Sequence, residues 1–295
     1  MALFKKKEKK SYIKRTRFGE FWHQFTKNKG ACVGLVILFL LFLVVVFGDV
    51  LWDYKGEVTW VDLKLKRVGT SWEHPFGTDN LGRDMLARIG YGARYSLAIG
   101  FGTTIIAGLL GTTLGAIAGY YGDPIETIIM RIIEIYLMIP GVLLVICVVT
   151  ALGYSVASLI IAIGLTTTPR FARLARTAVL STRNSEYVEA AKAAGARDMH
   201  IIFKHVLPNG ISPILVQITM TVAGNIIAAS SYSYLGLGVP APKPEWGLLL
   251  SEGRSYMRTN PELTLFPGLA IMITVLALNL VGDGVRDALD PRLKR

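Results

Sequence analysis

The sequence predicts an all-α integral membrane protein with six transmembrane helices and with both termini in the cytosol. The chain has 295 residues, 52% of them hydrophobic, and a mean hydropathy of +0.45, which is too apolar for a soluble domain of this size. Several uncharged runs are long enough to cross a bilayer. The Lys and Arg residues gather at the ends of these runs, where they act as topology signals.

The formal net charge of +11 does not indicate a nucleic-acid partner. The basic residues mark the ends of apolar runs instead of covering a soluble face. Cys32 and Cys147 both lie inside apolar runs, without neighbours at metal-ligand spacing. The sequence therefore predicts neither a metal site nor a disulfide framework.

Residues 1–30 form a basic arm, with ten Lys or Arg against Glu8 and Glu20. Aromatic residues between Tyr12 and Phe25 alternate with basic ones, which fits either a short interfacial helix on anionic lipid or a flexible topogenic arm. The arm precedes the first predicted span, residues 31–51. It therefore places the N-terminus in the cytosol and the membrane lipid among the expected partners.

The segment of residues 52–94 is expected outside the cell. Residues 52–93 contain six acidic and six basic residues, without the excess of Lys and Arg that marks cytosolic loops. The stretch from Phe76 to Asp84, F-G-T-D-N-L-G-R-D, is a polar loop rich in turn residues. Its Asp residues lack the spacing of a calcium-binding loop, so we predict no calcium site there.

Residues 95–283 are predicted to form a five-helix core, followed by a cytosolic tail at 284–295. Gly111, Gly115 and Gly119 recur every fourth residue and leave bare backbone on one face of the second span. This pattern predicts close packing against another helix.

The third span begins near Ile135 and should kink at Pro140-Gly141. Such a kink suits a gate but also occurs in helices without one. Arg131 and Glu134, three residues apart, should form an ion pair near the cytosolic end of this span.

A further span, residues 212–235, carries more polar side chains than a helix facing lipid would expose. Such side chains either bond across helices or line a wet path. We favour path lining for Asn225, Ser230 and Ser231, with Pro140 as a gate residue; interhelical packing is the alternative.

Residues 181–208 combine charge with a helical pattern between two apolar runs. Asn184 or Ser185 can cap a first helix, and Gly195 stands where a left-handed C-terminal cap would go. Asp198 can cap a second short helix, 199–207, which Pro208 should end. Seven Lys or Arg against three acids between residues 170 and 204 place this helix-glycine-helix unit in the cytosol.

Glu189-Ala190-Ala191, followed by Gly195 and Leu207-Pro208, resembles the EAA loop of permease subunits in binding-protein-dependent ABC importers. His205 departs from that pattern, which usually has isoleucine there. The 76–84 stretch, L-G-L-G-V-P at 235–240 and E-W-G at 245–247 extend the resemblance to the C-type permeases of dipeptide and oligopeptide importers, a branch that includes nickel importers.

The resemblance implies a type I ABC importer permease fold in the cell membrane. It implies a permease subunit of an ATP-driven peptide importer that pairs with a second permease, two cytosolic ABC ATPase subunits and an extracytoplasmic substrate-binding protein. The residues that it assigns to ATPase coupling are Glu186, Glu189, Ala190, Ala191, Gly195, Asp198, Leu207 and Pro208.

The chain has no G-x-x-x-x-G-K-[ST] motif, and none of its four His lies in an H-E-x-x-H context. We therefore expect no catalytic site and no cofactor on this chain, and ATP with Mg²⁺ on the partner subunits. A nickel importer of the same family and an ion-coupled secondary transporter are the alternatives. The latter should show ionisable groups at the midplane, and every predicted span centre is uncharged.

Overall fold

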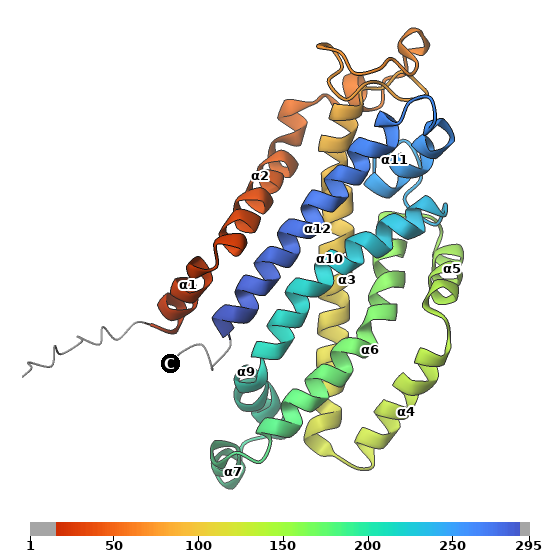
Figure 1. Cartoon of the computed structure of the whole chain (residues 1–295). Helices are drawn as coiled ribbons and strands as arrows, with labels where there is room; N and C mark the ends of the chain where they lie inside the picture. The colour runs from red at the N-terminus through yellow and green to blue at the C-terminus, as the bar shows by residue number, and fades with distance from the viewer. Residues whose placement is uncertain (1–15, 290–295) are drawn as a thin grey trace, which may run out of the picture.

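The computed structural model describes residues 16–289 and is built from helices (Figure 1). The α-helices are α1 (Arg17–Lys27), α2 (Lys29–Leu51), α3 (Met85–Tyr121), α4 (Ile125–Met138), α5 (Gly141–Leu152), α6 (Val156–Thr182), α7 (Glu186–Ala193), α8 (Asp198–Ile201), α9 (Leu207–Gly210), α10 (Ser212–Tyr234), α11 (Trp246–Gly253) and α12 (Glu262–Leu289). Short π or 3₁₀ turns occupy Tyr54–Val58, Leu63–Leu65, Ile202–Val206 and Arg254–Tyr256.

Four helices of the described chain, α2, α3, α10 and α12, are long and apolar enough to cross a membrane, and α4 with α5 would make a fifth span if they act as one broken helix. The predicted count of six crossings also requires α6. That count, and the cytosolic placement of both termini, stay predictions.

The predicted kink at Pro140 is a complete break. Ile139 is extended, with φ −81° and ψ 124°, because proline disfavours helical conformation in the residue before it. The axes of α4 and α5 differ by 89°. The predicted ion pair on α4 is confirmed, since Arg131 Nη1 lies 2.9 Å from Glu134 Oε2.

The glycine face of α3 packs directly against α6, as its four-residue spacing predicts. A Cβ atom on Gly111 would lie 2.5 Å from the Thr168 carbonyl oxygen, and one on Gly115 would lie 2.1 Å from that of Ala172. A Cβ on Gly119 would approach the carbonyl oxygen of Arg176 to 2.8 Å. The two helices are thus in contact along three turns, with no room for side chains between them.

The N-terminal helix α1 folds back onto the end of α12. Phe25 is buried there, and Asn28, which caps α2, donates a hydrogen bond to Asp287 Oδ2 at 3.0 Å. Residues 1–15 of the predicted basic arm lie outside the described residues. In Figure 1, α1, the end of α12 and α7 to α9 lie toward one end of the bundle, and residues 52–84 lie at the opposite end.

Candidate functional site: coupling segment and outer charge network

The first arm of the predicted coupling segment, α7, ends in a Schellman motif. Gly195 has φ +76°, a left-handed conformation that favours glycine. Its N–H donates to the Lys192 carbonyl oxygen at 2.9 Å, and the N–H of Ala196 donates to that of Ala191 at 3.1 Å. These two bonds satisfy carbonyl groups that the end of a helix leaves free. The predicted glycine cap is confirmed.

Buried apolar residues fix the segment to the bundle, and they come from both of its arms. Val188 of α7 and Ile201, Val206 and Leu207 of the second arm pack with Phe171 of α6 in one core cluster. Leu207 is among the residues predicted to couple to an ATPase. In the chain alone its side chain is buried in this cluster, so it fixes the segment to the bundle and is not open to a partner protein.

The opposite surface of the segment faces solvent. Ala191 is half-buried, and the exposed residues among those predicted to couple are Glu186, Glu189, Ala190, Gly195, Asp198 and Pro208. Ala193 and Ala194 extend this surface. Small side chains at the end of α7 leave its backbone open to close approach by another protein.

Two local predictions for this segment, those for Asp198 and Pro208, are wrong, and the prediction for Ser185 is right in position only. Ser185 occupies the N-cap position of α7, but its hydroxyl donates to the Thr182 carbonyl oxygen at 2.7 Å and makes no cap bond. Asp198 is the first residue of α8, not its cap; its carboxylate instead accepts from the hydroxyl of Tyr120 on α3 at 2.9 Å. That bond ties the second arm to α3.

Pro208 does not end the second arm. The chain stays helical from α8 through Gly210, and the turn before the proline, Ile202–Val206, is a π-helix. A π turn moves each hydrogen bond to the fifth preceding residue, which leaves room for a ring that would clash with a regular α-helical carbonyl. In this turn the ring of His205 lies 5.7 Å from that of His200, centroid to centroid.

The residues assigned to a translocation path lie in different surroundings. Asn225 is buried, donates to Thr104 Oγ1 of α3 at 2.9 Å and accepts from Thr167 Oγ1 of α6 at 3.3 Å. These bonds are interhelical, as the packing alternative requires. Ser230 is buried, whereas Ser231 is exposed on α10 and Pro140 is exposed at the α4–α5 break. Path lining by these residues stays a prediction.

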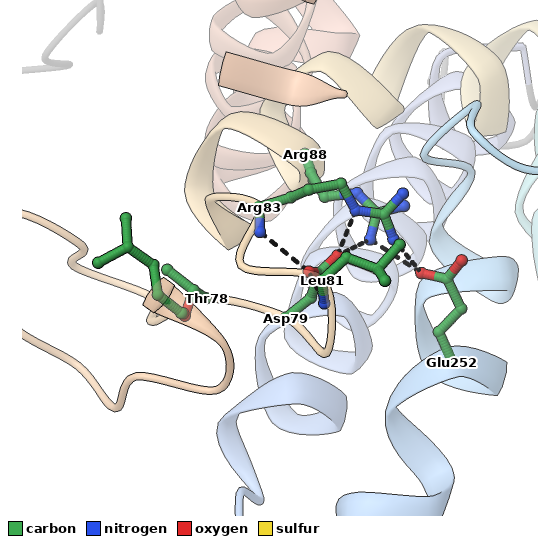
Figure 2. Close-up of polar contacts among 7 residues, drawn as sticks. Thr78, Asp79, Leu81, Arg83, Arg88 and Glu252 are labelled. Carbon is green, nitrogen blue, oxygen red and sulfur yellow. Dashed lines mark hydrogen bonds and ion pairs between the residues drawn. The ribbon is translucent and has the colours of Figure 1, made fainter. Parts of the chain in front are cut away.

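At the opposite end of the bundle, four charged residues form a network, which we call the outer charge network: Asp79, Arg83, Arg88 and Glu252 (Figure 2). Asp79 Oδ2 lies 2.6 Å from Arg83 Nε and 2.5 Å from Arg88 Nη1. Glu252 Oε2, on α11, lies 2.8 Å from Arg88 Nη1 and 3.2 Å from Arg83 Nη2. Two carboxylates thus neutralise two guanidinium groups.

Burial makes this network sensitive to the loss of any one charge. The Arg88 side chain is fully buried, whereas that of Glu252 is 22% exposed. Asp79 Oδ1 also accepts from the backbone N–H of Leu81 at 2.8 Å and of Arg83 at 3.0 Å, which closes the turn of the 76–84 loop. Gly82 in that turn has φ +80°. The turn therefore positions both arginines.

Sequence reasoning identified the 76–84 stretch but missed the network and α11. The sequence does place Arg83 four residues and Arg88 nine residues after Asp79, close enough for local ion pairs. Nothing in the sequence pairs them with Glu252, more than 160 residues away.

Glu245 caps α11 with a buried carboxylate. It accepts hydrogen bonds from the N–H groups of Gly247 and Leu248, at 2.9 and 3.0 Å, and from Ser96 Oγ of α3 at 3.2 Å. Burial raises the pKa of the Glu245 carboxyl, and the three hydrogen bonds partly offset that increase. This cap holds α11 against the N-terminal half of α3.

Comparison with known proteins identifies the family. The sequence profile described as "Binding-protein-dependent transport system inner membrane component" matches residues 111–295, and that of the "N-terminal TM domain of oligopeptide transport permease C" matches residues 16–64. The dipeptide transport system permease protein DppC of Alkalihalophilus pseudofirmus is 46% identical over 275 residues, 93% of this chain and 90% of the relative. The glutathione transport system permease protein GsiD of Pectobacterium atrosepticum is 42% identical over 280 residues, 95% of this chain and 93% of the relative.

Solved structures agree at the level of the fold. An inward-facing structure of the MetNI methionine ABC transporter has a chain that matches with a TM-score of 0.58 at 19% identity, over 70% of this chain and 98% of that one. A chain of an amino acid ABC transporter matches with a TM-score of 0.52 at 13% identity, over 68% and 94%. The predicted resemblance is confirmed: this chain belongs to the family of binding-protein-dependent ABC transporters, as one of its inner-membrane permease components.

Proposed function

We propose that this chain is a permease subunit of an ATP-driven importer of short peptides, and that α7 with its glycine cap is its coupling helix. The capped helix with an exposed, alanine-rich surface, held to the bundle by buried residues of both arms, carries this proposal. Such an element can transmit a push because its buried side is fixed to α6 while its open side is free for docking. The dipeptide and glutathione permeases among its relatives support a peptide cargo.

The proposed partners follow from this assignment, because a permease subunit with a coupling helix needs other subunits to hydrolyse ATP and to deliver the peptide. Two cytosolic ABC ATPase subunits bind and hydrolyse ATP with Mg²⁺, and one of them receives α7. A second permease completes the translocation path, and an extracytoplasmic substrate-binding protein delivers the peptide to the end that carries the outer charge network. Closure of the ATPases would then turn the bundle from inward-facing to outward-facing.

Purification in mild detergent tests the coupling assignment. A tagged parent chain should retain an ATPase subunit. Ala190→Arg should lose it, because a long charged side chain blocks close approach to α7. The matched control is Thr70→Arg, which adds the same side chain to an exposed position of the outer segment. An Ala190→Arg chain that still retains the ATPase, or a parent that never does, would refute the proposal.

Uptake by the reconstituted importer tests the cargo separately. A labelled dipeptide should accumulate when ATP is supplied and Ni²⁺ should not. Accumulation of Ni²⁺ alone would move the proposal to the nickel branch, with the coupling assignment intact. Uptake that needs an ion gradient instead of ATP would contradict both.

A further inference from the structure

A polar hollow lies between α4 and α6. Both helices reach the end of the bundle at which α6 leads into the coupling segment (Figure 1). Its volume is about 380 Å³. The lining residues are Glu126, Thr127, Met130, Arg131, Glu134, Arg173, Arg176 and Thr177. All of these side chains except that of Met130 are polar.

The charges that line the hollow do not cancel. Glu134 is paired with Arg131, and Glu126 is paired with Arg176. The guanidinium group of Arg173, exposed on the same face of α6, has no ion-pair or hydrogen-bond partner among the described residues. The lining therefore carries one net positive charge, which favours an anionic ligand.

An exposed apolar stripe adjoins these charges on α4. Ile128 and Ile135 precede and follow Arg131 by three and four residues, so they lie on the same side of the helix. Ile128 is 58% exposed, and Ile132 and Ile135 are each 62% exposed. The ligand that fits both features has an anionic head for Arg173 and an apolar body for the stripe.

We propose that this hollow binds the phosphate of an anionic phospholipid, with Arg173 as the contacting residue and the acyl chains along Ile128, Ile132 and Ile135. Basic pockets between membrane helices are suited to such headgroups, since a guanidinium group forms strong charge-assisted hydrogen bonds with phosphate oxygens. A free phosphate or a peptide carboxylate would satisfy Arg173 but would leave the stripe uncovered.

Native mass spectrometry of the intact complex, extracted from bilayers of equal parts phosphatidylglycerol and phosphatidylcholine, tests the site. The parent should retain phosphatidylglycerol in preference. Arg173→Gln keeps both ion pairs and should lower that preference about five-fold, the factor expected for one arginine near an anionic surface. Arg170→Gln is the matched control, because Arg170 is exposed on the same helix but outside the hollow; it should keep the preference of the parent.

The remaining outcomes overturn the proposal. Equal losses in both variants would mean general electrostatic attraction, and no loss in either would mean that lipid does not bind at Arg173. A third arm adds inorganic phosphate to the detergent-solubilised complex. If inorganic phosphate is retained as well as the phospholipid, and if Arg173→Gln abolishes that retention, the ligand is a soluble anion. Equal expression and elution of the two variants shows that neither result reflects misfolding.

Discussion

Asp79 is the residue on which the outer charge network depends. Its two oxygens accept from two guanidinium groups and two backbone N–H groups, so the same carboxylate neutralises charge and closes a turn. Arg88, fully buried, has Nε and Nη2 atoms without a partner among the described residues. Its burial is therefore tolerable only while its ion pairs with Asp79 and Glu252 persist.

Replacing Asp79 with Asn should destabilise the chain by about 3–5 kcal/mol, the usual cost of leaving a buried charge without its partner. Chemical unfolding of the purified chain in detergent measures the effect. Glu252→Gln is the graded control: it should cost less, because Glu252 is partly exposed and Asp79 still pairs with both arginines. An equal loss of stability in the two variants would show that the buried carboxylate contributes no more to stability than the partly exposed one.

Glu245 should make the stability of the outer end depend on pH. Because its folded-state pKa is raised above the ordinary value of 4.5, the folded state favours the protonated carboxyl. Stability is therefore fully present below that ordinary pKa and is lost as pH rises through the raised one. Glu245→Gln should remove this decline and keep an oxygen that can accept from the α11 N–H groups.

Thermal unfolding of the parent and of Glu245→Gln at a series of pH values measures the difference. The exposed Glu57 supplies the control, since Glu57→Gln should leave the pH profile of the parent unchanged. A parent that gains stability with rising pH relative to Glu245→Gln would contradict the assigned direction of the pKa shift.

Among the elements, the sequence predicted those that depend on local pattern. The glycine face of α3 and the left-handed Gly195 follow from spacing and from the conformational freedom of glycine, and both are present. The helix through Pro208 and the cap of α8 could not be read in the same way. The π turn and the Tyr120–Asp198 bond depend on packing between the second arm and α3.

The helix that holds the second predicted span is longer than the core boundary at residue 95 indicated. It begins at Met85, and α11 was not predicted at all. The core was predicted to begin after Arg94, because charges are rare in spans. In the structure the helix already contains Arg88 and Arg94. The charge of Arg88 is neutralised by Asp79 and Glu252, and Arg94 pairs with Asp49. A buried network formed by distant residues leaves no local signature.

Gly195→Val should uncouple the importer without disturbing the bundle. A branched residue in a left-handed conformation costs about 1–2 kcal/mol, which lowers the population of the capped form by about five- to thirty-fold. A Cβ atom at Gly195 would meet no atom within 4 Å, so the cost of placing a side chain there comes from the left-handed backbone. Peptide uptake and stimulated ATPase activity of the reconstituted importer should fall together.

Gly195→Asn is the matched control for that variant, because asparagine adopts the left-handed conformation more readily than valine. It should retain most of the activity. Unchanged uptake in Gly195→Val would count against the cap as part of the coupling element, provided that the variant reaches the membrane in normal amount.

Gly115→Ala should destabilise the α3–α6 contact by about 1–3 kcal/mol, the range for overpacking a core. The added methyl group would meet the Ala172 carbonyl oxygen at 2.1 Å, and backbone cannot yield as a flexible side chain can. Gly108→Ala, on the same helix, is the control, since its nearest neighbour would be a side-chain atom of Ile218 at 3.9 Å. Denaturant unfolding should separate the two variants; equal midpoints would contradict close packing at Gly115.

At the scale of the whole molecule, α3 connects the two ends. With 37 residues it is about 55 Å long, well beyond the roughly 30 Å of a hydrocarbon core. Its first turns hold Arg88 and pack with Trp246 and Leu249 of α11, and its later turns lie on α6. Tyr120, near its last residue, binds Asp198 of the coupling segment. A displacement at one end of the bundle can therefore be transmitted to the other end along this single helix.

That arrangement requires the two ends to face opposite sides of the membrane, which cysteine labelling can test. Trp72 is fully exposed in the outer segment, and Ala193 is exposed at the end of α7. In a chain with Cys32 and Cys147 replaced by Ala, Trp72→Cys should react with a membrane-impermeant maleimide added to intact protoplasts. Ala193→Cys should react only after the membrane is permeabilised. Labelling of both positions from the outside would place α7 beyond the reach of a cytosolic ATPase, and the coupling assignment would fail even though the family membership stands.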